Sequence, residues 1–90
     1  MRFTVVWKST AESQLASIWN SSLDRSDVTA AADAIDGVLR DDPLLRGETL
    51  SRTTRVLIQA PLLIKYRVSE DDRIVRVLMV ERIPTDSSRN

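Results

Sequence analysis

The second half of the chain contains three short apolar runs, each of which also carries arginine or lysine. They span residues 54–59, 62–68 and 73–83 and are rich in valine, isoleucine and leucine, a composition typical of β-strands. Side chains of a strand alternate between two faces, so a sheet built from these runs would bury one face and expose a set of cations on the other. The runs therefore predict a sheet, and they make the role of its cations the functional question.

The first half predicts one more strand and then a helix. Residues 3–7 are β-branched or aromatic, which favours a strand. Ser9 and Glu12 have the spacing of a capping box, which predicts that a helix starts there. Helical periodicity places an apolar stripe toward the core and a polar face toward solvent; the stripe is Ala11, Leu15, Ile18, Trp19 and Leu23, and the polar positions are Glu12, Gln14, Ser17 and Asn20. We expect Trp19 in the core and leave Trp7 open.

A second helix follows after a short turn. Ser26 or Asp27 is expected to cap it, and Asp42-Pro43 ends it because the residue before a proline avoids helical geometry. Two helices joined so closely form an antiparallel hairpin. The order β-α-α-β-β-β predicts an α+β fold in which this hairpin packs on a mainly antiparallel four-stranded sheet. We expect a single domain over residues 1–84 and a flexible tail at residues 85–90.

Alternation also predicts which strand residues face the helices. Leu62, Ile64, Tyr66 and Val68 share one face of their strand and should pack on the helices, whereas Leu63, Lys65 and Arg67 share the other face. In residues 73–83 both faces are mixed. We expect Arg76 to be exposed, because an unpaired buried charge is very costly.

Two missing residue types narrow the possible chemistry. The chain has no cysteine and no histidine, so it cannot form disulfides or Ser-His-Asp arrangements, and it lacks the usual general base near neutral pH. We expect no metal and no cofactor. No apolar run has the length of a membrane span, and the start does not have the pattern of a signal peptide. The expected location is the cytoplasm.

The charges are balanced overall but unevenly distributed. The formal net charge is zero; residues 1–50 hold five basic and eight acidic side chains, and residues 51–90 hold eight and five. Such asymmetry also arises by chance in small soluble domains. Proteins that bind nucleic acid usually carry a positive excess, because each neutralised phosphate adds affinity through counterion release. Zero net charge therefore weakens a nucleic-acid hypothesis without excluding it.

The order of the elements and the local sequence patterns resemble those of the RelE/ParE superfamily of bacterial toxin-antitoxin and plasmid stabilization systems. The resemblance covers roughly residues 3–84, and its last two strands look more like the ParE branch. The segments that carry it are Val6-Trp7; Ala11, Leu15, Ile18 and Trp19; Val28, Ala32, Ile35 and Leu39 with Asp42-Pro43 and Gly47; Arg55-Val56-Leu57; Ile64 to Val68; and Ile74 to Leu78 with Arg82. It implies a small cytoplasmic toxin neutralised by an antitoxin that lies over its surface.

The two branches imply different mechanisms. RelE-like toxins are endoribonucleases that cleave messenger RNA in the ribosome. In this chain the catalytic groups of such an enzyme would have to come from Arg52, Arg55, Lys65, Arg67 and Arg82. This sequence departs from the RelE pattern, because the strand entry Pro61-Leu62-Leu63 lacks an arginine and no aromatic residue or histidine follows Arg82. Tyr66, the only tyrosine, is expected in the core.

ParE-like toxins bind a type II topoisomerase, usually DNA gyrase, and need no catalytic groups. We favour this binding mechanism and expect a partner-binding set of arginines that contacts an acidic antitoxin segment more than an RNA. The set is Arg52, Arg55, Arg67, Arg76 and Arg82. A relative that keeps the fold without toxicity is the remaining alternative.

Overall fold

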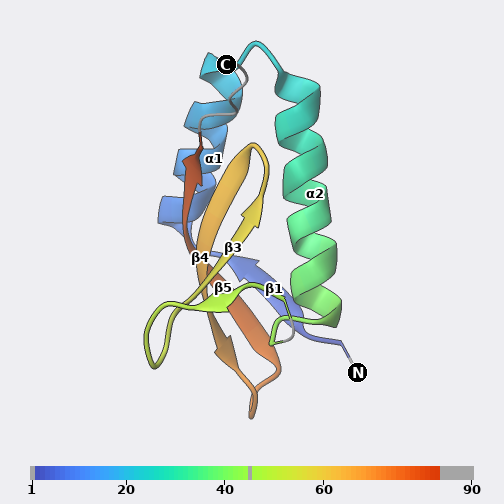
Figure 1. The fold of residues 1–90 in the computed structure, drawn as a ribbon, viewed down its shortest axis with the longest axis vertical. Helices are drawn as coiled ribbons and strands as arrows, with labels where there is room; N and C mark the ends of the chain where they lie inside the picture. The colour runs from blue at the N-terminus through green and yellow to red at the C-terminus, as the bar shows by residue number, and fades with distance from the viewer. Residues whose placement is uncertain (1, 45, 84–90) are drawn as a thin grey trace.

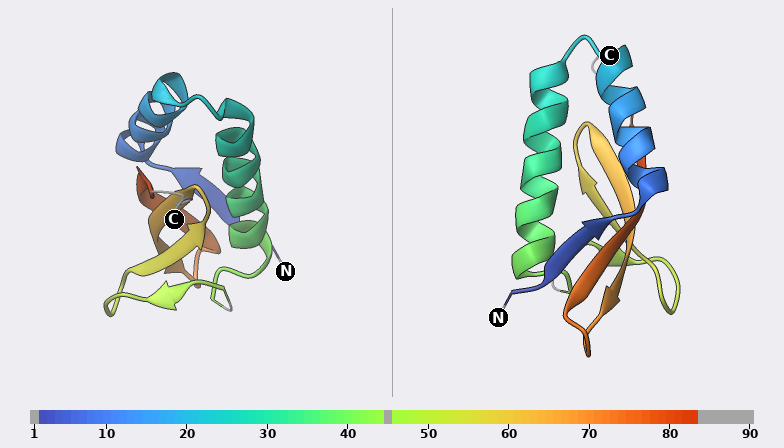
Figure 2. Two further views of the ribbon diagram at one scale, coloured as in Figure 1. Left: turned by 45° about the horizontal axis from the view of Figure 1, so that its top comes forward. Right: turned by 180° about the vertical axis from the view of Figure 1, so that it is seen from behind.

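The computed structural model describes residues 2–44 and 46–83. Two helices lie beside each other and cover one face of a sheet, as Figure 1 and the left view of Figure 2 show. The predicted tail at residues 85–90 lies outside the described residues. No helix in the described part has both the length and the apolar character that crossing a membrane requires. The elements in chain order are β1 (Thr4–Trp7), α1 (Ser9–Ser21), α2 (Arg25–Asp41), β2 (Glu48–Thr49), β3 (Arg55–Gln59), β4 (Leu62–Ser69) and β5 (Ile74–Arg82).

The sheet has five strands in the order β1-β5-β4-β3-β2, where the sequence predicted four. The additional strand, β2, has two residues and pairs with Arg55 and Val56 of β3. A strand of two residues is too short for sequence periodicity to reveal. β1 pairs with β5 in parallel, and all other pairs are antiparallel. The α+β fold with a helix hairpin on a mainly antiparallel sheet is confirmed.

The core lies between the sheet and the two helices. Leu62, Ile64 and Tyr66 of β4 are fully buried, and Val68 packs against them while remaining half-buried. From the helices, Ala11, Val28, Ala31, Ile35 and Leu39 complete this layer. The predicted inner face of β4 is therefore confirmed.

A β-bulge in β5 changes the faces that simple alternation predicts. Tyr66 pairs with Val77 and Lys65 pairs with Met79, so Leu78 is an extra residue in β5. An extra residue reverses the alternation beyond it. The three buried valines of β5, which are Val75, Val77 and Val80, therefore all face the helices. The bulge thus decides the orientation of β5, which alternation alone left open, and Arg76 is exposed as predicted.

The first helix begins at Ser9 as predicted, but the capping residues predicted for both helices were wrong. Lys8 is the N-cap of α1 and Asp24 is the N-cap of α2, and neither cap is closed by a side-chain hydrogen bond. Ser9 is thus inside α1 and forms no capping box. Gln14 does not face solvent, because its Oε1 accepts a hydrogen bond from the Val80 amide at 2.8 Å.

The core stripe of α1 ends earlier in the structure than the sequence predicted. Trp19 is 41% exposed and Leu23 is fully exposed, so both expectations were wrong. Leu23 lies beyond the end of α1 at Ser21, where helical spacing no longer applies. Trp19 lies toward α2, and its indole Nε1 donates to Thr29 Oγ1 at 3.1 Å.

Candidate functional site

The cations proposed for catalysis lie on two opposite faces of the sheet. Arg55 pairs with Tyr66 and Arg82 pairs with Leu62, so both occupy the face that the helices cover. Lys65 and Arg67 alternate along β4 with Leu62 and Tyr66, so their side chains point to the opposite, open face of the sheet. The fold therefore does not bring the four side chains together around one substrate position.

Arg55 is engaged by the connection that leads from α2 into β3. Its Nη2 donates to the carbonyl oxygens of Leu44 at 3.0 Å and Arg46 at 3.3 Å, and its Nη1 donates to Thr49 Oγ1 at 3.1 Å. Its Nε lies 3.4 Å from the Tyr66 hydroxyl. Hydrogen bonds from a charged donor are stronger than neutral ones, so Arg55 anchors this connection from within.

The Tyr66 hydroxyl closes the same network. It lies 2.8 Å from the carbonyl oxygens of both Pro43 and Arg46, and its single proton serves these acceptors. Gly47 passes directly over it with a φ of 78°, and a Cβ at this position would lie 2.7 Å from the hydroxyl and 2.6 Å from the Val56 oxygen. The Tyr66 side chain therefore has a structural role in the core, as the sequence predicted.

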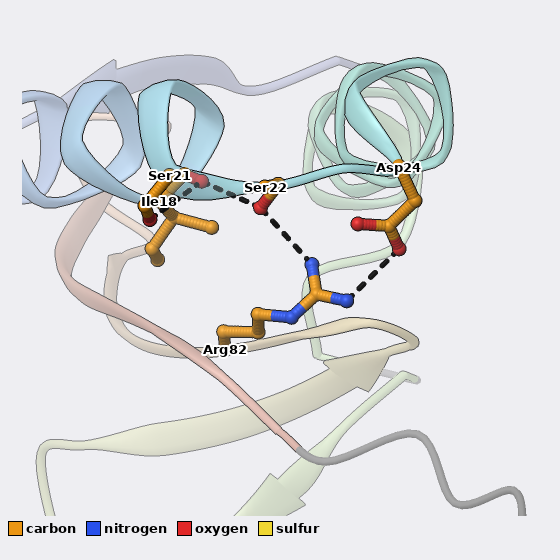
Figure 3. A network of polar contacts seen from close by, with 5 residues as sticks. All are labelled: Ile18, Ser21, Ser22, Asp24 and Arg82. Atoms are coloured by element: carbon orange, nitrogen blue, oxygen red, sulfur yellow. Dashed lines mark hydrogen bonds and ion pairs between the residues drawn. The ribbon is translucent and has the colours of Figure 1, made fainter.

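Arg82 joins the end of β5 to the turn between the helices, as Figure 3 shows. Its Nη2 donates to Asp24 Oδ2 at 2.9 Å and its Nη1 donates to Ser22 Oγ at 3.2 Å. Ser22 is buried and donates in turn to the Ile18 carbonyl at 2.5 Å. The hydrogen bond from Arg82 lowers the pKa of Asp24 below its ordinary value, and the same bond raises the pKa of Arg82. The Asp24 carboxylate therefore binds Arg82 and does not cap the N-terminus of α2.

The other predicted arginines are available to a partner. Arg67 and Arg76 are exposed and lie in register on the open face of β4 and β5. Arg52 is exposed in the connection before β3, and with Arg67 it lines a depression of about 270 Å³ that also includes the hydroxyl residues Thr49, Ser51 and Thr53. The partner-binding role of all five arginines stays a prediction, and the fold presents three of them to solvent without an internal ion pair among the described residues.

A groove that the sequence did not predict lies between the two helices. It has a volume of about 520 Å³, and apolar side chains line much of it: Trp7, Leu15, Trp19, Val28 and Ala32, with the acidic residues Glu12, Asp33 and Asp36. The Arg25 guanidinium lies 4.7 Å from the centre of the Trp19 ring, a cation–π distance. The only sign of this groove in the sequence was Trp19, near the end of the apolar stripe. A tryptophan at that position is equally compatible with a core residue.

No protein-family model and no curated protein match the chain by sequence. Its fold is similar to a chain of the toxin-antitoxin complex RelBE2 from Mycobacterium tuberculosis, with a TM-score of 0.77, 24% identity, and coverage of 91% of this chain and 99% of that one. A chain of the ParDE TA system from P. aeruginosa gives 0.69 and 14%, covering 91% and 97%. A chain of the archaeal RelE-RelB complex from Pyrococcus horikoshii gives 0.65 and 13%, covering 96% and 100%. These similarities confirm the expected fold.

Proposed function

With the RelE/ParE fold as the premise, we propose that this chain is the toxin-like component of a type II toxin-antitoxin system and acts by binding a protein. The proposed target is DNA gyrase, as for the ParE branch, and the proposed location is the bacterial cytoplasm. A cognate antitoxin neutralises the chain by covering its surface. No catalytic step is required of it.

The groove between α1 and α2 is the observation that carries this proposal. Large exposed apolar surfaces on small soluble proteins usually mark interaction sites, and tryptophan is among the residues that dominate binding energy at protein interfaces. Trp19 stays 41% exposed although the core lies within reach of the same helix. The helix hairpin thus presents an aromatic anchor inside an apolar depression, which suits contact with a protein.

The placement of the polar groups also favours binding over catalysis. Cleavage of RNA through its 2′-hydroxyl needs a positioned base and acid together with cations at the phosphate. Arg55 and Arg82 are held by internal acceptors, and the Tyr66 hydroxyl is buried against two carbonyls. The alternative, a RelE-like messenger-RNA endoribonuclease that acts at the ribosome, would have to use Lys65, Arg67 and Arg76, which form no ion pair within the described residues.

The two activities are separated by parallel assays. The purified chain is tested for inhibition of gyrase supercoiling, and induced cells are tested for growth and for messenger-RNA cleavage on ribosomes. Inhibited supercoiling with intact messenger RNA supports the proposal. Cleavage with normal supercoiling supports the ribonuclease, and normal growth with neither effect indicates a non-toxic relative.

A matched pair of variants tests the groove. Trp19→Ala removes the aromatic anchor and should weaken gyrase inhibition by about tenfold or more, as expected for an interface hot spot. Leu23→Ala removes an apolar side chain that is fully exposed outside the groove and should leave inhibition unchanged. Equal effects of the two variants, with folding checked by circular dichroism, would contradict a role of the groove.

The antitoxin is tested by co-expression. A short open reading frame beside this gene that encodes a helical protein with an acidic tail should restore growth and co-purify with the chain. Continued growth arrest when the two are co-expressed would contradict the assignment.

A further inference from the structure

Two arginines face each other directly on the open face of the sheet. Arg67 of β4 is the register partner of Arg76 of β5, and directly opposed residues of antiparallel strands have their Cβ atoms about 5 Å apart. Lys65 lies two residues before Arg67 and therefore on the same face. Three cations thus gather on adjacent strands, although like charges in opposed positions destabilise a sheet.

No carboxylate within the described residues forms an ion pair with this group. None of the three ion pairs formed within residues 2–44 and 46–83 involves Lys65, Arg67 or Arg76, and their side chains donate no hydrogen bond within the described chain. Glu48 and Glu81 belong to the same face by register, yet neither pairs with these cations. The opposed arginines are therefore unlike Arg82 and Arg55, whose donors are used internally.

Apolar side chains surround the cations on this face. Val6 of β1 is in register with Arg76 and is 42% exposed, and Ile58 of β3 is 58% exposed. Leu63 and Met79 lie on the same face by register and are half-buried. The open face is thus a mixture of cations and exposed hydrocarbon.

We propose that Arg67 and Arg76 form a carboxylate-binding site for an acidic, partly apolar segment of a partner protein, which we assign to the antitoxin. A guanidinium binds a carboxylate through two parallel hydrogen bonds. Two adjacent guanidinium groups can therefore hold successive acidic side chains of an extended segment. The segment's apolar residues would cover Val6, Ile58 and their neighbours.

The same face is poorly suited to RNA. Sites for single-stranded nucleic acid combine cations with aromatic side chains on which bases stack. The four aromatic residues lie elsewhere: Trp7 and Tyr66 share the helix-covered face by register, Trp19 is on α1, and Phe3 packs against the core. The zero net charge of the chain also weakens the long-range attraction on which phosphate binding depends.

The site is tested on the purified chain with a short synthetic peptide in which glutamate alternates with valine. The double variant Arg67→Ala/Arg76→Ala should bind this peptide about tenfold more weakly or worse, because it lacks both charged donors. The control Lys8→Ala/Arg46→Ala removes two exposed cations that belong to neither β4 nor β5 and should bind as the unmodified chain does. Added salt should weaken the binding of the unmodified chain.

Stability and RNA binding provide the deciding controls. Without peptide, the double variant should melt at the same or a higher temperature than the unmodified chain, since it relieves the opposed charges. A lower melting temperature, unchanged peptide binding, or tighter binding of a single-stranded RNA of equal charge would each overturn the proposal.

The inference rests on the proposed function only in assigning the segment to the antitoxin. Loss of antitoxin binding in the double variant supports that assignment, and unchanged antitoxin binding overturns it. A failure of the gyrase assay would affect the proposed function alone, because peptide binding is measured without gyrase.

Discussion

Gly47→Ala should strongly destabilise the protein, because the fold admits no side chain at this position. The backbone there has a φ of 78°, and for residues with a Cβ this left-handed conformation costs about 1–2 kcal/mol. The Cβ would also lie 2.6 Å from the Val56 carbonyl oxygen and 2.7 Å from the Tyr66 hydroxyl. Displacing that hydroxyl from its buried acceptors costs about 1–3 kcal/mol more. The expected loss of unfolding free energy is therefore about 2–5 kcal/mol.

Urea denaturation followed by circular dichroism measures this loss. The chain offers a matched control in Gly37, which lies inside α2 with nothing within 4 Å of an added Cβ. Gly37→Ala should raise the unfolding free energy by about 0.5–1 kcal/mol, because alanine favours helix over glycine. The same chemical change should thus act with opposite sign at the two positions.

A double-mutant cycle identifies the cause of the Gly47 effect. Tyr66→Phe removes the hydroxyl that the new methyl group would strike, so Gly47→Ala should cost less in the Tyr66→Phe background, with a coupling of about 0.5 kcal/mol or more. A loss below about 1 kcal/mol for Gly47→Ala, or strict additivity with Tyr66→Phe, would refute the reasoning.

Two further predictions concern the internally bound arginines. Arg82 lowers the pKa of Asp24 in the folded state, so the unfolded chain binds this proton more readily; the stabilisation is present above the ordinary aspartate pKa of about 4 and is lost as the pH falls through the lower folded pKa. The difference in melting temperature between the unmodified chain and Asp24→Asn should therefore shrink below about pH 4, and a constant difference would contradict the assignment. Arg55→Met should lower the unfolding free energy in urea by about 1–3 kcal/mol, because the Leu44 carbonyl loses its donor and the Arg46 carbonyl keeps only the proton of Tyr66. The neighbouring Arg52→Met, at an exposed position, should change it by less than about 0.5 kcal/mol, and equal effects would contradict an anchoring role for Arg55.

Local patterns were sufficient to predict most elements and the inner face of β4. Leu62, Ile64 and Tyr66 alternate without interruption, and a strand with one uniformly apolar side has only one favourable way to face a core. The helix hairpin was equally accessible, because Pro43 limits the second helix and the apolar positions repeat at helical spacing. Each of these predictions depended on neighbours in the sequence.

The sequence did not predict where β5 changes face or which arginines remain free. The extra residue Leu78 leaves no mark in the sequence, because the bulge exists only relative to the register of β4. It places Arg82 on the helix side, where Asp24 is available. Strict alternation placed Arg82 and Arg76 on one face, and the fold separates them.

The sequence by itself determined the order of the longer elements, the α+β class and most of the core, because burial of apolar side chains follows from short-range periodicity. Only the tertiary structure decided the roles of the arginines. Their chemistry is the same along the chain, but the contacts differ: Arg55 and Arg82 meet carbonyl, hydroxyl and carboxylate acceptors from distant segments, whereas Arg67 and Arg76 meet each other. A charge takes its role from the groups around it, and long-range packing selects those groups.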